Sequence, residues 1–396
     1  MDETIRKRSQ VAATFLKIGV LGFGAPAIWG LIQAEVQERR GWLSKERYLE
    51  GLALVNALPG APAMQMCIFA GHQRAGMWGG LLAGLAFMAP AFAMVLLLSA
   101  LASAYGALPV LRDAFYGLSP VVLGIFIVAI YRLGTTAIKD VSSILIAATA
   151  AGAAAFSLLG LPGILLLAAC AGVATHYSRK AGLIAAIIAV LLIGAERLVD
   201  KTFAVSMSAT AAPDLWSLGT FFFKVGAVTF GGGMTIIYFV QDQVVNHLHW
   251  ITAQEFLECL TLAQFTPGPI IMVGAYVGYK VAGFAGAAVA ALAIFLPSFL
   301  LMLSILPVFE RVRRLAWVKA AMRGISPAVV GAIVVSIVHL APHAAPDLFA
   351  ALLLAGSVVA LLVWRKLPVV PLTLGGGLIG ILARSRLAHR LRELAF

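Results

Sequence analysis

Charged residues are scarce in this chain, and that scarcity excludes a soluble globular protein. Only 12% of its 396 residues are charged, whereas 61% are hydrophobic. Water could not solvate a surface of that composition. Apolar runs recur nearly from end to end, each close to the roughly 20 residues that span a bilayer as a helix. The composition therefore predicts an all-α polytopic membrane protein.

Acidic residues and cysteines are also few. Seventeen Asp and Glu stand against 29 Lys and Arg, which leaves a net charge of +12. The basic residues cluster between apolar runs, an arrangement typical of membrane flanks and not of nucleic-acid binding. A positive bias also suits an anionic solute. Cys67, Cys170 and Cys259 form no CxxC pair, so we expect packing residues and neither disulfides nor a metal site.

Motifs of catalysis are missing as well. The chain has no Gly-x-x-x-x-Gly-Lys-[Ser/Thr], no Gly-x-Ser-x-Gly and no His-Glu-x-x-His. We therefore expect neither an enzyme nor an ATP-driven pump, and no cofactor. His247 and His249 form a His-x-His pair, but no third ligand accompanies them, so no metal is expected.

What the chain does contain is two copies of one unit. Phe15 to Gly24 returns at Phe222 to Gly231, 207 residues later, and Asp140 returns as Asp347. We expect an N-terminal transporter repeat over 1–180, a linking helix and loop over 181–215, and a C-terminal repeat over 216–396. A duplicated apolar chain is typical of a secondary transporter, whose site lies where the repeats meet.

Each repeat is predicted to hold about six transmembrane segments. The first copy has candidates near 11–33, 51–72, 79–104, 114–133, 141–160 and 161–177, and a linking span follows at 181–199. The second copy has them near 216–240, 258–281, 283–308, 321–340, 347–364 and 367–383. With thirteen full spans the repeats are inverted; if 161–177 does not cross, they are parallel. We favour inverted repeats.

A glycine cluster interrupts the first span of each repeat. Three glycines in a row inside a span each cost about 1 kcal/mol of helix stability relative to Ala. Non-helical backbone at membrane depth persists where it lines a cavity or is buried in protein, and freed N–H groups favour an anion. The alternative is close helix packing through small residues. The candidate substrate-binding residues here are Phe23, Gly24, Phe230, Gly231, Gly232 and Gly233.

A Pro-Gly-Pro element interrupts the second span of each repeat. Two prolines around a glycine end one helix and begin another. An amide side chain, which donates to an oxyanion without titrating, stands three residues before the first proline in both copies. The alternative is a structural kink. The candidate residues are Asn56, Pro59, Gly60, Gln264, Pro267, Gly268 and Pro269.

Charged residues within the apolar runs form a third group. Lys17 and Lys224 lie about two turns inside the first span of each repeat, where they either bind substrate or extend to the nearer interface. Glu50 and Glu258 begin the second spans, either as proton carriers or as solvated helix starts. Arg323 has no cationic counterpart in the first repeat and is a candidate for charge coupling.

These paired motifs give the chain a family resemblance. The duplicated Phe-x-x-x-Gly-x-x-x-Phe-Gly-Gly pattern, the Trp-x-[Ser/Thr]…[Phe/Tyr]-Leu-Glu stretch and the Pro-Gly-Pro element resemble the chromate ion transporter (CHR) family, long two-domain type. The resemblance implies a bacterial inner-membrane protein that exports chromate, confers chromate resistance and meets sulfate as a competitor. The first copy departs from the pattern at Gly24-Ala25-Pro26 and at Pro59-Gly60-Ala61-Pro62, so the two halves are not expected to bind identically.

Together these features predict a secondary transporter that moves a tetrahedral dianion by alternating access. The expected partners are chromate, sulfate, an unidentified coupling ion or proton, the lipid bilayer and a second copy of the chain, and no nucleic acid. The alternatives are a transporter of sulfate or another small anion, or an anion channel.

Overall fold

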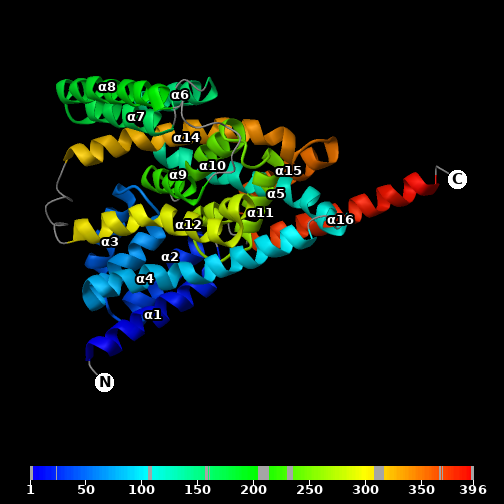
Figure 1. Cartoon of the computed structure of the whole chain (residues 1–396), viewed down its shortest axis with the longest axis horizontal. Coiled ribbons are helices and arrows are strands. Elements are labelled where there is room, and N and C mark those ends of the chain that lie inside the picture. Colours follow the sequence, from blue (N-terminus) through cyan, green and yellow to red (C-terminus); the bar gives the residue numbers. More distant parts are fainter. Residues whose placement is uncertain are drawn as a thin grey trace.

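The computed structural model describes residues 3–23, 25–105, 109–156, 159, 161–203, 214–229, 235–306, 316–364, 367 and 369–393. Every regular element among these residues is a helix, as the composition predicts, from α1 in dark blue to α16 in red (Figure 1). The first repeat comprises α1 (Glu3–Leu21), α2 (Ala25–Gln33), the π-helix η1 (Ala34–Arg39), α3 (Lys45–Ala57), α4 (Pro62–Tyr105), α5 (Pro109–Ala137), α6 (Val141–Ala155) and α7 (Leu161–His176).

The second repeat follows the linking helix α8 (Arg179–Phe203) and presents equivalent elements in the same order. It comprises α9 (Leu215–Ala227), α10 (Thr235–Val240), the π-helix η4 (Gln241–His247), α11 (Ala253–Gln264), the 3-10 turn η5 (Ile270–Met272), α12 (Val273–Ile305), α14 (Ala316–Ala344), α15 (Leu348–Val363) and α16 (Val369–Glu393). Even the two π-helices recur, so the duplication read from the sequence extends to local backbone geometry.

The first predicted span, 11–33, consists of two helices that fold back on each other. Lys17 Nζ of α1 lies 2.6 Å from Glu35 Oε1 of η1. In one continuous helix these residues would be about 27 Å apart, at 1.5 Å rise per residue. The chain therefore reverses between Leu21 and Ala25. The prediction of a single broken span is corrected to an antiparallel hairpin with the glycine motif at its tip.

The second predicted span, 51–72, is also a hairpin. The Arg47 guanidinium of α3 lies over the Phe69 ring of α4 at 5.5 Å, and Arg74 lies over the Trp42 ring at 5.6 Å. Residues at or just before the start of α3 thus meet residues seven and twelve positions after Pro62, so the two helices are antiparallel. The tip is the Pro59-Gly60 turn, where Gly60 takes φ +120°, a value that favours glycine.

The helix α4 reverses direction once more at Ala75 and Gly76, which leave the helical region of φ and ψ. A Cβ placed on Gly71 would overlap the carbonyl oxygen of Gly79, so the segments on either side of the turn pack backbone to backbone. The equivalent helix α12 turns the same way at Ala282 and Gly283, with Gly278 against Gly286. Small residues permit this close approach.

The last two helices of each repeat pack on the other repeat. Helices α6 and α7 lie against α14, and α15 and α16 lie against α5. Glycines lie where these helices cross. Gly331 of α14 meets the backbone of Ala147 in α6, and Gly117 of α5 meets Gly376 and Gly380 of α16. The two repeats are therefore interleaved, each holding a helix pair of the other.

Four helical stretches among the described residues are long and apolar enough to cross a membrane: Pro62–Tyr105, Arg112–Ala137, Ile270–Ile305 and Ala316–Ala344. They contain the predicted spans 79–104, 114–133 and 321–340 and most of 283–308. The shorter apolar helices α6, α7, α15 and α16 cover most of the remaining peripheral predictions. Where the second halves of α4 and α12 pack, Gly84 meets Phe299 and Gly80 meets Leu303, so these equivalent helices run antiparallel (Figure 1).

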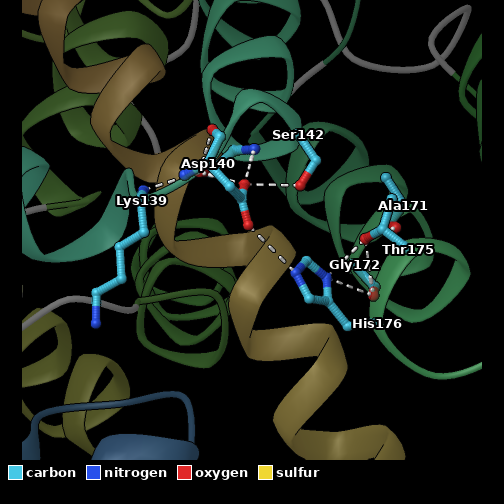
Figure 2. A network of polar contacts seen from close by, with 8 residues as sticks. Lys139, Asp140, Ser142, Ala171, Gly172, Thr175 and His176 are labelled. Carbon is cyan, nitrogen blue, oxygen red and sulfur yellow. Dashed lines mark hydrogen bonds and ion pairs between the residues drawn. The ribbon is translucent and has the colours of Figure 1, made fainter.

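Matching aspartates begin the sixth helix of each repeat. Asp140 Oδ1 accepts from the Ser143 N–H at 2.7 Å, and Asp347 Oδ1 accepts from the Ala350 N–H at 2.8 Å. This backbone hydrogen bond, with those from two serine hydroxyls, holds the pKa of the Asp140 carboxyl well below its usual range. Figure 2 shows the same carboxylate facing the ring of His176, 3.7 Å away, at the end of α7.

The glycine crossings make a testable prediction. Gly331→Ala should lower the free energy of unfolding by about 1–3 kcal/mol, because the new Cβ would overlap the Ala147 carbonyl oxygen. Gly356→Ala on α15 is the matched control: its Cβ would meet nothing within 4 Å, so it should be neutral or slightly stabilising. Thermal unfolding of the purified protein in detergent measures both, and equal midpoints would contradict the close crossing.

Candidate functional site

The second repeat also folds into two hairpins: Phe221 of α9 stacks on Phe239 of α10 at 5.9 Å, and Glu255 of α11 pairs with Lys280 of α12 at 3.4 Å.

The hairpin tips of the two repeats meet in two reciprocal pairs. The Gly60 N–H, at the second tip of the first repeat, donates to the Thr229 carbonyl at the first tip of the second repeat, at 2.7 Å. The Gly268 N–H donates to the Gly22 carbonyl at 2.8 Å. These two bonds connect equivalent positions with the repeats exchanged. They join the glycine and Pro-Gly-Pro motifs that the sequence singles out separately.

The backbone N–H groups of Gly60 and Gly268 are used between the repeats, so they do not remain for a bound anion. In the first turn of α4, which begins at Pro62, the Gln65 N–H donates to the Ala61 carbonyl at 2.9 Å. The N–H groups of Ala63 and Met64 precede it at a helix start, where N–H groups have no intrahelical acceptor.

The two Pro-Gly tips are built differently. At the first, Ser298 Oγ of α12 accepts from the Ala61 N–H at 3.1 Å, and Gln65 Nε2 donates to the Pro59 carbonyl at 2.6 Å. At the second, Gly268 packs against the methyl group of Ala91, and the Thr266 hydroxyl donates to the Ala263 carbonyl of the preceding helix α11. Ala61, the extra residue of the first copy, thus brings an extra N–H that Ser298 satisfies.

Several predicted site residues lie at these tips. Phe23 follows Gly22 and is 41% exposed, Pro267 is buried, and Gln264 is the last residue of α11. Pro269 precedes the turn η5. Asn56 lies in the last turn of α3, and its side chain is outside the described part of the structure. Gly24, Phe230, Gly231, Gly232 and Gly233 lie outside the described residues.

Lys17 is held by an acid that the sequence analysis missed. Glu35 is 3% exposed and accepts from Lys17, from Arg39 at 2.8 Å and from Arg40 at 3.4 Å. This cluster joins the two arms of the first hairpin. The sequence contained a signal for this acid, because Glu35 and Asp242 occupy equivalent positions in the two repeats. Both side chains are buried in the structure.

The second repeat arranges the same residue types differently. Asp242 accepts from Gln243 Nε2 at 3.0 Å and lies 3.7 Å from His247 Nε2. Lys224, the counterpart of Lys17 in the second repeat, is exposed and makes no ion pair with another described residue. Lys224 is therefore the lysine of the pair that remains available to a ligand.

The predicted coupling residues lie farther from the tips. Glu50 pairs with Arg47 at 2.8 Å. Glu258 is partly buried one turn after Glu255, which pairs with Lys280 at 3.4 Å. Ser44 caps the start of α3, and Thr252 forms a capping box with Glu255 at the start of α11.

Arg323 lies on α14 next to Gly324, where that helix meets α7, and is not among the tip contacts. Among the described residues no three His, Cys, Asp or Glu side chains come together as a metal site would require. The three cysteines are buried and free, in keeping with packing residues.

Comparison with known proteins identifies the family of this chain. A family model described as Chromate transporter matches residues 9–176 and 216–381. The chain belongs to the chromate transporter family. It is accordingly a multi-pass membrane transport protein and not an enzyme.

Relatives match nearly the whole chain. The Chromate transport protein of Cupriavidus metallidurans is 32% identical over 96% of this chain and 94% of its own length. The Chromate transport protein of Pseudomonas aeruginosa is 32% identical, covering 94% and 91%. The Probable chromate transport protein of Synechococcus elongatus is 32% identical over 86% of both chains. No solved structure matches this chain significantly.

The Glu35 cluster yields a prediction about stability. Glu35→Ala should lower the free energy of unfolding by about 1–3 kcal/mol, because three cations lose a buried acceptor. Lys17→Ala should cost less than about 1 kcal/mol, since the Lys17 side chain is 47% exposed and Glu35 keeps two arginines.

Glu38→Ala is the matched control on the same π-helix, because Glu38 is exposed. Chemical denaturation in detergent micelles measures all three variants. A Glu35 variant as stable as the Glu38 variant would remove the cluster from its proposed role in closing the hairpin.

Proposed function

We propose that this protein is a secondary transporter that exports chromate across the bacterial inner membrane by alternating access and so confers chromate resistance. The observation that carries the proposal is the reciprocal meeting of the four hairpin tips, at equivalent positions of the two repeats. The substrate is inferred from the relatives, which are named as chromate transport proteins.

The two repeats insert into the membrane with opposite orientations in this proposal. The antiparallel packing of the equivalent helices α4 and α12 supports this, because helices that both cross a bilayer and run antiparallel enter it from opposite sides. Residues 1–180 and 216–396 then form the two moving units, joined by 181–215. Rocking of one unit against the other exposes the central tips to each side in turn.

The binding groups are drawn from both repeats. The first turn of α4 offers N–H donors, Lys224 offers a charge without an ion-pair partner among the described residues, and Asn56 and Gln264 offer amide donors. Glycines have no Cβ, so the glycine motifs of the two repeats suit a close approach of backbone to the substrate. Lys17, which pairs with Glu35, contributes by holding the two arms of the first hairpin together.

Charge gives the direction of transport. Each negative charge that leaves an interior negative by 100 mV gains about 2.3 kcal/mol. An oxyanion is therefore driven outward by the membrane potential alone, and Glu50 and Glu258 are the candidates for any additional coupling to protons. Sulfate, which has the same tetrahedral shape, is expected to compete.

The direct test is uptake of labelled chromate by everted inner-membrane vesicles, with and without energisation and excess sulfate. Saturable, energy-dependent accumulation above that of vesicles lacking the protein is the expected result. Accumulation that rises linearly with concentration and never exceeds equilibrium would identify an anion channel. Sulfate accumulation without chromate accumulation would reassign the substrate.

Two substitutions test the site. Lys224→Ala and Gln264→Ala should each reduce chromate uptake at least tenfold, because each removes a donor to a charged ligand, worth about 1.5–3 kcal/mol. Lys139→Ala, outside the tips, and Gln254→Ala, exposed on the same helix as Gln264, are the matched controls and should transport normally. Immunoblotting of the vesicles checks equal amounts, and normal uptake by both site variants would overturn the assignment.

A further inference from the structure

Gln65 carries an unused hydrogen-bond acceptor at the first Pro-Gly tip. Its side chain is fully buried, at 0% exposure, and its Oε1 has no hydrogen-bond partner among the described residues. The orientation of the amide is determined, because Nε2 donates to the Pro59 carbonyl at 2.6 Å and the reversed amide would place two oxygens together. A buried acceptor without a donor is costly and is rare in folded proteins.

Gln65 lies beside a helix start and a second polar side chain, Ser298. It lies in the first turns of α4, whose N-terminal N–H groups favour an anion. A Cβ on Gly60 would overlap both Ser298 Oγ and Gln65 Nε2, so the two polar side chains converge on this glycine. A ligand held by the helix start would therefore meet donors and one acceptor together.

The turn itself does not require these polar side chains. Gln65 aligns with Met272 in the second repeat, and Ser298 aligns with Ala91 in the first. The second tip takes the same positive φ at Gly268 with apolar residues at both places. Ser298 Oγ accepts from the Ala61 N–H, but no described residue donates to Gln65 Oε1.

We propose that Gln65 Oε1 accepts the O–H of a monoprotonated tetrahedral oxyanion and thereby makes the site prefer hydrogen chromate to sulfate. Hydrogen chromate loses its proton near neutral pH, so a substantial fraction carries an O–H there. Hydrogen sulfate is a strong acid, so sulfate would place an oxygen lone pair against that of Gln65. This assignment rests on the proposed function and specifies the ionic form of its substrate, which then carries one negative charge across the membrane.

Equilibrium binding of labelled chromate to the purified protein at neutral pH tests the assignment without depending on direction or coupling. Unlabelled competitors fall into two classes: arsenate and phosphate, which retain an O–H at this pH, and sulfate and selenate, which do not. We expect the first class to displace chromate from the wild-type protein roughly tenfold more strongly than the second, as loss of one buried hydrogen bond predicts. Equal displacement by both classes would overturn the proposal.

Gln65→Met, which copies the second repeat, should abolish the difference between the classes, while Gln73→Met, exposed on the same helix, should retain it. A purely structural role for Gln65 would weaken binding of all four competitors alike and keep their order, and that result would also overturn the assignment. If Gln65→Met does not fold, the wild-type panel alone decides. No chromate binding by folded wild-type protein would instead refute the proposed substrate, a result distinct from binding without discrimination.

Discussion

The architecture depends on two hydrogen bonds that the repeats exchange, from Gly60 to Thr229 and from Gly268 to Gly22. Four half-length hairpins place non-helical backbone deep inside an apolar protein, where each unpaired peptide group would cost several kcal/mol in hydrocarbon. At each Pro-Gly tip the glycine N–H is bonded by the opposite repeat. Each supplies the carbonyl that the other needs, so the central site exists only when both copies are assembled.

The same reciprocity extends outward. Because α6 and α7 pack on α14 while α15 and α16 pack on α5, the peripheral helices hold the opposite repeat in place. Glycines let those helices approach until backbones touch, as they do within the reversals of α4 and α12. The helices that surround the tips therefore come from both repeats.

The positions of the breaks were predictable from the sequence, but their shapes were not. Three glycines or a Pro-Gly-Pro element interrupt a helix in either geometry, and only long-range contacts decide whether the chain continues or returns. The salt bridge between Lys17 and Glu35 and the contact of Arg47 with Phe69 decide it here. The reversal at Gly76 lacks proline altogether and depends on a single positive φ.

Glu35 escaped sequence analysis for a related reason. It stands in a polar flank where an acid is unremarkable, and only the folded hairpin buries it beside Lys17. Gln65 gave no repeat signal at all, since its counterpart is Met272. Comparison of the two copies finds what both halves need for the fold, but it overlooks side chains that only one half uses.

That difference between the halves bears on mechanism. Two identical tips would separate from their partners equally easily, whereas the driving force sets the direction of net transport in either case. Here the Pro-Gly tip of the first repeat is held by hydrogen bonds of Ser298 and Gln65, and Glu35 closes the α1–α2 hairpin. In the second repeat, the Pro-Gly tip packs against Ala91, and Lys224 has no ion-pair partner among the described residues. The two tips therefore differ in their polar contacts: a movement that separates the first tip from α12 must break the hydrogen bond of Ser298 with Ala61, which has no counterpart at Ala91.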